Sequence, residues 1–337
     1  MAYASSFLSI VAAFVHVWLW HGQDIYRRFQ AALHQIEDKD DNGDIHNVLM
    51  RAYPDVSESF FLGFLFVLVL FQISISFTTP FHMPVWAILL CLFMSLLSVL
   101  PIGIITAVSG QRLGLNVLTE FVIGLLMPGE TIPVMAFKSL GTNSVSQAIM
   151  LLQDLKLGHY MKINPRHMIA AQLYGSLIGA IINTSCCFWV LDNMKSLLGT
   201  GDWQATSFFV FYNAGAIWGA IGPKRFFGIG SVYESLLYAF ALGLILPFIP
   251  YLLNKTYPHT LWKYVHVPLL SSFDGPGRYQ NRVIIPLLVA WYFQYYRARY
   301  HPIWWQKYNY VLAVRTTYPG SFGCWRWSLC IVGRDIW

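Results

Sequence analysis

Long hydrophobic runs separated by short polar segments make up most of this chain. No Asp, Glu, Lys or Arg occurs between Glu58 and Arg112, and later runs of similar composition follow. A helix needs about 20 apolar residues to cross a bilayer. The runs predict spans at residues 2–20, 59–79, 84–108, 167–191, 203–223, 235–254 and, as a shorter apolar window, 283–296. This pattern is typical of an all-α, polytopic transmembrane helical bundle.

The stretch 109–167 departs from this pattern. Polar residues alternate in it with apolar turns, and glycines and prolines interrupt it repeatedly. Broken backbone at membrane depth is tolerated only where it is buried in protein or lines a wet cavity. Short hydrophobic pieces interrupted by Gly and Pro indicate the binding site of a transporter. We therefore predict a helix, a re-entrant dip and a second basic segment that together line a substrate path.

The most polar segment, residues 22–57, follows the first span. It predicts a short amphipathic helix, an acidic loop at residues 37–44 and a second helical turn. The placement of Lys and Arg assigns this segment to the cytoplasm, because cytoplasmic loops carry an excess of these residues. The basic residues of the loop 255–282 disagree with the resulting topology.

Composition excludes several classes of protein. The 337 residues are 56% hydrophobic and only 11% charged, whereas soluble domains carry about 25% charged residues. The net charge of +6 is spread over loops, which fits loop bias in a membrane protein and predicts no nucleic-acid partner. The five cysteines show no metal or redox spacing, so we expect them to be packing residues and predict no cofactor or metal.

Motifs of catalysis are missing from the sequence. It contains no nucleotide-binding loop, no zinc-binding helix and no Ser-His-Asp spacing. We therefore predict that the chain is not an enzyme and that ATP does not drive it.

The stretch 109–167 also carries a family resemblance. LGLNVLTEFVIGLLMPGETIPVMAFKSLG, followed by SQAIMLLQDLKLGHYMKINPRHM, resembles the signature of the oligopeptide transporter family, in its fungal and plant peptide-transporter branch. VHVWLWHGQDIYRRF, LPIGIITAVSG, AIWGAIGPKRFFG and WWQKYNYVLA extend the likeness from about Val15 to Ala313. The resemblance implies secondary active transport of small oligopeptides (tetra- or pentapeptides, or glutathione-like peptides), coupled to protons, in the plasma membrane.

Departures from the family pattern qualify this expectation. Family members carry further spans upstream of the matching region, so we interpret residues 1–313 as a partial transporter membrane domain. The tail 314–337 is unmatched, and a shifted reading frame or a mispredicted exon explains it. Two alternatives stay open: an inactive truncated membrane remnant, and a metal-chelate transporter of the same superfamily. The sequence does not define an oligomeric state.

A transported peptide has an ammonium group, a carboxylate and unpaired amides, so its path needs acidic, basic and neutral partners. Glu120 lies four residues after Asn116, which places both on one helix face. Its carboxyl group is a candidate for reversible protonation or for binding a substrate ammonium. The alternative is a structural ion pair with Arg112 or Lys138.

The other candidates have two interpretations each. Lys138 meets a substrate carboxylate or pairs with Glu130. Gln147 and Gln172 bind peptide amides or join neighbouring helices. The polar run at the end of the stretch forms a cytoplasmic gate or proton-exit relay, or it fixes the re-entrant segment to the bundle; it comprises Asp154, Lys156 and His159.

Overall fold

The computed structural model describes residues 2–34, 45–54, 56–79, 81–110, 112–193, 206–228, 230–231, 233–257, 262, 265–272, 288 and 291–308. The chain divides into two units, which consist essentially of Tyr3–Ser272 and Phe273–Trp337. The second unit contains the π-helix η4 (Trp291–Arg297) and the short helix α14 (Ala298–Tyr300). All sites discussed below lie in the first unit.

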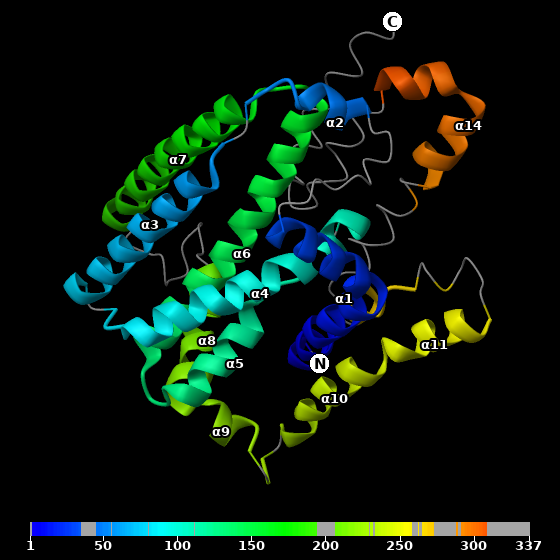
Figure 1. Cartoon of the computed structure of the whole chain (residues 1–337). Coiled ribbons are helices and arrows are strands. Elements are labelled where there is room, and N and C mark those ends of the chain that lie inside the picture. The colour runs from blue at the N-terminus through cyan, green and yellow to red at the C-terminus, as the bar shows by residue number, and fades with distance from the viewer. Residues whose placement is uncertain are drawn as a thin grey trace, which may run out of the picture. The chain divides into compact units, whose positions relative to one another are not determined.

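Helices make up the described part of the first unit (Figure 1). In chain order they are α1 (Ala2–Leu33), α2 (Ile45–Met50), α3 (Glu58–Thr78), α4 (Val85–Ser109), α5 (Asn116–Leu126), α6 (Thr131–Tyr160), α7 (Pro165–Asn193), α8 (Thr206–Ala214), the π-helix η1 (Gly215–Ile221), α9 (Pro223–Phe226), the 3-10 helix η2 (Glu234–Leu237), α10 (Tyr238–Ile245), α11 (Phe248–Thr256) and α12 (Val267–Ser272).

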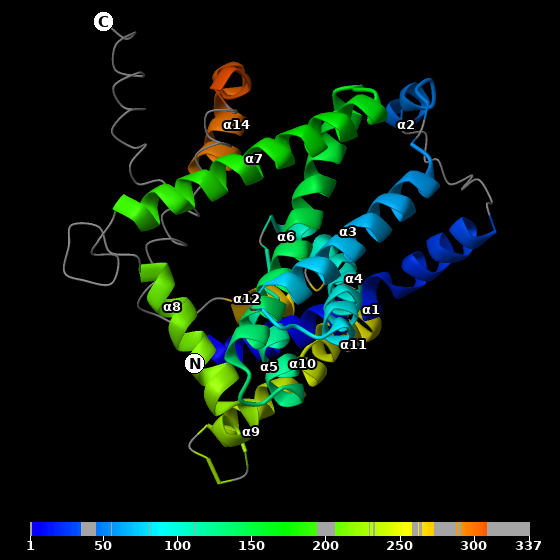
Figure 2. The same cartoon turned by 90° about the vertical axis from the view of Figure 1, so that its left-hand side faces the viewer.

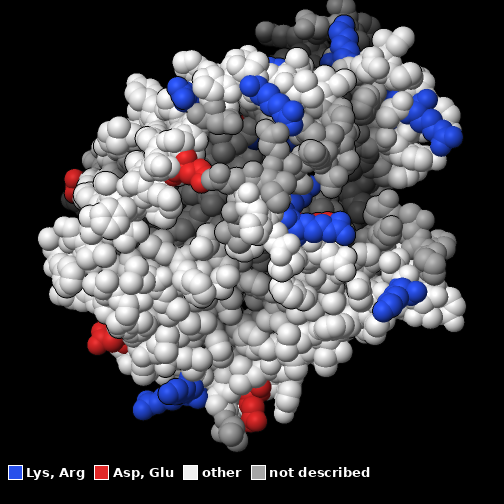
Figure 3. Space-filling view, in the orientation of Figure 1, with Lys and Arg blue, Asp and Glu red and all other residues white. Residues whose placement is uncertain are grey.

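Five helical stretches of the described chain are long and apolar enough to cross a membrane. They are Tyr3–Ala31, Glu58–Thr78, Val85–Ser109, Pro165–Asn193 and Glu234–Thr256. On the face drawn in Figure 3, charged side chains are sparse and broad uncharged surface separates them. The predicted all-α membrane bundle is confirmed.

The helix α6 is the central element of the first unit. Figures 1 and 2 both show it running from α5 and η1 at one end to α2 and the start of α7 at the other. It crosses α4 at Gly141, where an added Cβ atom would lie 3.1 Å from both Cys91 Sγ and Thr119 Cγ2. Ser95 Oγ donates a hydrogen bond to the Gly141 carbonyl oxygen at 3.3 Å. Small residues thus bring the two backbones together, as is common in membrane helices.

The helix α5 packs against η1 and α9 through another close backbone approach. A Cβ atom on Gly124 would lie 2.6 Å from the carbonyl oxygen of Trp218. The turn after α5 is joined to η1 by a hydrogen bond from Gly129 N–H to the Gly219 carbonyl oxygen at 3.0 Å. Phe7 of α1 fills the space beside this contact, with its ring centroid 5.6 Å from that of Phe121.

The helices α3 and α7 contrast with this core. No side chain of α7 is buried in the described structure, and Ser76 is the one buried residue of α3. Both helices are apolar enough to span the bilayer, so their outer surfaces suit contact with lipid or with other membrane helices.

The structure corrects two local predictions. The helix α1 continues without a break to Leu33, so the amphipathic helix expected within residues 22–57 begins as its extension. A break expected in the stretch 109–167 occurs at residues 127–130, but Pro133, Gly141 and Gly158 do not interrupt α6. Pro133 lies in the first turn, where backbone N–H groups have no helical partner.

Some predictions fall outside the described residues. These are the acidic loop at residues 37–44, most of the apolar window 283–296 and the tail 314–337.

Candidate functional site

One face of α6 lines a cavity of about 900 Å³. The residues that α6 contributes recur every three or four positions, so they share a helix face: Thr131, Ile132, Met135, Ala136, Ser139, Leu140, Asn143, Ser144 and Gln147. The opposite wall comes from α3, the loop before α4, and the α8–η1 helix. The π-helical backbone of η1 supplies Gly215, Ala216 and Ala220 to this wall. Such π-helical segments often occur at functional sites.

The polar groups in this cavity are neutral amides and hydroxyls. Asn143 and Gln147 are exposed on successive turns of α6, and Gln72 of α3 supplies a third amide. Ser139 Oγ donates to the Met135 carbonyl oxygen at 2.8 Å, and Ser76 Oγ donates to the Met83 carbonyl oxygen at 2.6 Å. Their oxygen atoms can still accept hydrogen bonds from a ligand.

Of the predicted site residues, Gln147 alone lines this cavity. Sequence reasoning missed Asn143, Ser139 and Gln72. The spacing of Ser139, Asn143 and Gln147, four residues apart along an apolar helix, was the available signal.

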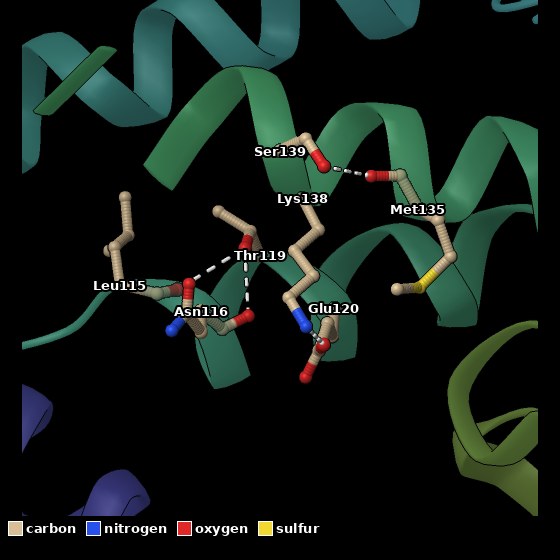
Figure 4. A network of polar contacts seen from close by, with 7 residues as sticks. All are labelled: Leu115, Asn116, Thr119, Glu120, Met135, Lys138 and Ser139. Atoms are coloured by element: carbon tan, nitrogen blue, oxygen red, sulfur yellow. Dashed lines mark hydrogen bonds and ion pairs between the residues drawn. The ribbon is translucent and has the colours of Figure 1, made fainter. Parts of the chain in front are cut away.

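An ion pair between α5 and α6, shown in Figure 4, lies beside the cavity. Glu120 is 2% exposed on α5, and Lys138 of α6 reaches it to form the pair. Lys138 is one of the two residues that the sequence offered as a structural partner for Glu120. Lys138 Nζ also lies 5.3 Å from the ring centroid of Phe211, whose side chain lines the cavity. The pair therefore places one charge of each sign close to the cavity wall, and each charge makes the burial of the other less costly.

The remaining partners considered for Glu120 and Lys138 are placed elsewhere. Arg112 donates a hydrogen bond to Gln153 at 3.0 Å. Glu130 is exposed just before α6. Asn116 begins α5 and is exposed; its carbonyl oxygen accepts a hydrogen bond from Thr119 Oγ1 at 2.8 Å.

A second polar cluster occupies the far end of α6. Gln172 of α7 donates a hydrogen bond to Asp154 at 2.7 Å. Lys156 lies with its Nζ 4.8 Å from the ring centroid of Tyr160. The distance from Lys138 to Asp154 along α6 is about 24 Å, at 1.5 Å per residue. The predicted residues of α6 thus fall into two groups, of which one contacts α5 and the other contacts α7.

The end of α6 is also joined to α2, a contact that sequence reasoning missed. Lys162 Nζ contacts His46 Nδ1 and donates to the His159 carbonyl oxygen at 3.3 Å. The ring centroids of His46 and Tyr160 are 5.1 Å apart. Together with Asp154 and Gln172, these contacts connect α2, α6 and α7.

Metal ligation finds no support in the described residues, where no group of three His, Cys, Asp or Glu side chains could hold an ion. Cys91 is buried in the α4–α6 contact, while Cys186 and Cys187 are exposed on α7. Cys324 and Cys330 lie outside the described residues.

The fold defines a multi-span helical membrane protein, in which neutral polar groups form part of the lining of a cavity between helices. Comparison with known proteins identifies its family. A sequence profile described as "OPT oligopeptide transporter protein" matches residues 1–314. The chain belongs to the oligopeptide transporter family.

Curated relatives from Arabidopsis thaliana agree. The chain is 34% identical to "Oligopeptide transporter 3" over 324 residues, which cover 93% of this chain and 43% of the relative. It is 35% identical to "Oligopeptide transporter 2" over 93% of this chain and 43% of the relative. It is 35% identical to "Oligopeptide transporter 7" over 93% of this chain and 41% of the relative. The chain thus spans less than half the length of these relatives. No solved structure matches it.

Proposed function

We propose that this chain forms a substrate-binding part of a secondary active transporter for small oligopeptides, coupled to protons and located in the plasma membrane. Tetra- or pentapeptides and glutathione-like peptides are the proposed substrates. The observation that carries the proposal is the α6 cavity with its neutral amide and hydroxyl groups. Family membership supports it, because the curated relatives are named oligopeptide transporters.

The chemistry of the cavity suits a peptide backbone. Each peptide unit has one N–H donor and one carbonyl acceptor, which need partners once water is removed. Asn143 and Gln147 each offer both an acceptor and donors. Ligand pockets commonly have volumes of about 300–1,000 Å³, and the cavity of about 900 Å³ lies in this range. Neutral partners favour recognition of the backbone over recognition of particular side chains.

The site residues outside the cavity have separate proposed roles. The Glu120–Lys138 pair, beside the cavity, is proposed to interact with peptide termini or a proton when the pair separates. Asp154, Lys156, His159 and Gln172, at the far end of α6, are proposed to gate the path. Asn116 is proposed to act at the start of α5.

Uptake into proteoliposomes tests this function. The chain is reconstituted and supplied with a labelled tetrapeptide, with glutathione or with an iron chelate, under an inward proton gradient. We expect accumulation of the peptide, and its loss when a protonophore collapses the gradient. Uptake of the iron chelate in place of peptides would support the metal-chelate alternative. Absence of both binding and uptake would support the inactive remnant.

Substitutions in the cavity test where the peptide binds. Asn143→Ala and Gln147→Ala each remove hydrogen-bonding groups from the α6 face. Loss of one hydrogen bond to a neutral ligand is worth about 0.5–1.5 kcal/mol, so we expect KM to rise about 2- to 10-fold. Gln23→Ala is the matched control, because Gln23 is exposed on α1. An equal effect in all three variants would argue against the cavity as the peptide site.

A further inference from the structure

Two histidines far apart in the sequence are hydrogen-bonded inside the first unit. His16 Nε2 of α1 lies 3.0 Å from Nδ1 of His266, the residue before α12. Their ring centroids are 4.9 Å apart, with an interplanar angle of 63°. His16 is 3% exposed. The contact therefore joins α1 to the start of α12 through two imidazoles, of which His16 is buried and His266 is half-buried.

The second ring nitrogen of His16 defines the chemistry of this pair. His16 Nδ1 is buried and has no hydrogen-bond partner among the described residues. A neutral imidazole has one N–H donor and one acceptor nitrogen. Burying an N–H group without a partner is costly, so the favoured tautomer has Nε2–H donating to His266. His16 Nδ1 then keeps a free lone pair, which makes it the proton-accepting atom of the pair.

The surroundings of the pair are mostly apolar. Ala13 and Val17, the α1 neighbours of His16, belong to a buried cluster to which α4 contributes Ile102 and Ile105 and α6 contributes Val145 and Ile149. The segment before α5 adds Leu113 and Leu115, and α12 adds Leu269. Among the described residues, no acidic group is one of the charges that act on His16 or His266.

Few titratable groups are close to the pair. A third histidine, His21, acts on His266 through its charge. From α11, Tyr251 meets the ring of Trp20 edge-on at 5.8 Å. Arg112, next to Leu113, is exposed and bonds to Gln153. An added positive charge on the pair would thus have no acidic partner among the described residues of this apolar wall.

We propose that His16 and His266 form a proton-binding site whose occupation opens the contact between α1 and α12. The proton adds to His16 Nδ1 and converts the ring to imidazolium. A charge in this apolar wall is costly, and hydration relieves that cost once the two segments separate. A second proton on the pair would set two N–H groups against each other and break the remaining hydrogen bond.

The direction of the pH dependence follows from linkage. Burial, and secondarily the charge of His21, lower the pKa of His266 below its ordinary value. The closed contact therefore favours the uncharged pair, and the open one binds protons more readily. As pH falls below about 6.5, the ordinary pKa of histidine, the open arrangement gains stability relative to the closed one. This site would supply the proton coupling of the proposed transporter. The coupling role rests on the proposed function, whereas the proton-binding site itself does not.

Trp20 provides a readout that does not depend on transport. Its ring centroid lies 5.9 Å from that of His16, and imidazolium quenches nearby indole fluorescence. The chain is titrated in lipid nanodiscs, and the signal of Trp20→Phe is subtracted to isolate Trp20. We expect at least a 1.5-fold loss of the Trp20 signal on acidification, absent in His16→Gln. His34→Gln is the matched control, because His34 is exposed just after α1.

Spin labels measure the opening itself. Tyr26 on α1 and Leu270 on α12 are both exposed, so cysteine-linked labels at these positions disturb little packing. We expect their separation to grow on acidification in the otherwise unaltered chain, and to stay constant with His16→Gln or His266→Gln. An unchanged Trp20 titration in His16→Gln, or an unchanged label distance at acidic pH, would overturn the proposal.

Transport then tests the coupling role. In proteoliposomes, His16→Gln should reduce uphill peptide accumulation at least tenfold while peptide exchange continues. Full accumulation in His16→Gln would remove the pair from coupling. If the unaltered chain transports nothing, the proposed function fails, whereas the fluorescence and distance measurements still decide whether the proton site exists.

Discussion

Glu120 and Lys138 illustrate how single residues determine the behaviour of the site. Each side chain carries a charge that the surrounding apolar helices could not accommodate alone. Together they form an ion pair between α5 and α6, close to the cavity. Removing one partner is therefore expected to do more harm than removing both, because the partner left behind keeps an uncompensated charge.

Substitution of one partner is predicted to destabilise the fold. Glu120→Gln should lower the free energy of unfolding by about 3 kcal/mol, near the lower end for a broken buried pair. The double variant Glu120→Gln, Lys138→Met should recover at least half of the loss. Denaturant unfolding in detergent measures both values. Equal stability of the single variant and the unaltered chain would show that the pair is not buried as described.

At the residue scale, the sequence predicts best those features that depend on neighbouring positions in the chain. A carboxylate in an apolar run identified Glu120 as a buried group, and Lys138 was among its considered partners. The His16–His266 contact could not be predicted, because nothing local to either residue indicates a partner 250 positions away. Asn143 was missed although its spacing from Gln147 places both on one face of α6.

Helices α4 and α6 pack closely because small residues lie where they cross. Gly141 lets Cys91, Ser95 and Thr119 approach the backbone of α6. Glycine in this stretch was interpreted from the sequence as a break in the helix. Its role in the structure is close packing, which is not apparent from the sequence alone because the neighbouring helix is distant in the chain.

A methyl group at this crossing is predicted to disturb it. In Gly141→Ala the new Cβ atom lies 3.1 Å from Cys91 Sγ and Thr119 Cγ2, and overpacking of this kind costs about 1–3 kcal/mol. Gly103→Ala, on α4, is the control, since nothing lies within 4 Å of its added Cβ atom. Thermal unfolding should show a lower Tm for Gly141→Ala only. A similar loss in both variants would point to a general effect of alanine in these helices.

At the scale of the whole molecule, the first unit has an apolar core around α5 and α6, and two spanning helices with little burial. The helical class and the positions of most spans followed from the hydrophobic runs alone, because a bilayer fixes the length of a span. The extents of α1 and α6 did not follow, since helices that extend through polar residues depend on contacts between elements.

Exposure of α7 leads to a prediction about lipid. Trp189 on α7 is 59% exposed, whereas Trp218 in η1 is fully buried. Phospholipids with brominated acyl chains quench indoles that they touch. Variants in which either tryptophan is replaced by phenylalanine assign the signals, and we expect at least twofold stronger quenching of Trp189 than of Trp218. Protection of Trp189 would show that protein covers this face of α7.

The length of α6 has a mechanical consequence. From its crossing with α4 at Gly141 to its end at Tyr160 it extends about 28 Å, at 1.5 Å per residue. A stiff rod that tilts by about 10° at this crossing would move its free end by about 5 Å, roughly the rise of one helical turn. The Asp154–Gln172 bond lies near that end, on the same rod as the cavity wall. A small rotation of α6 about its contact with Cys91 and Ser95 at Gly141 would thus displace its far end enough to break the Asp154–Gln172 hydrogen bond.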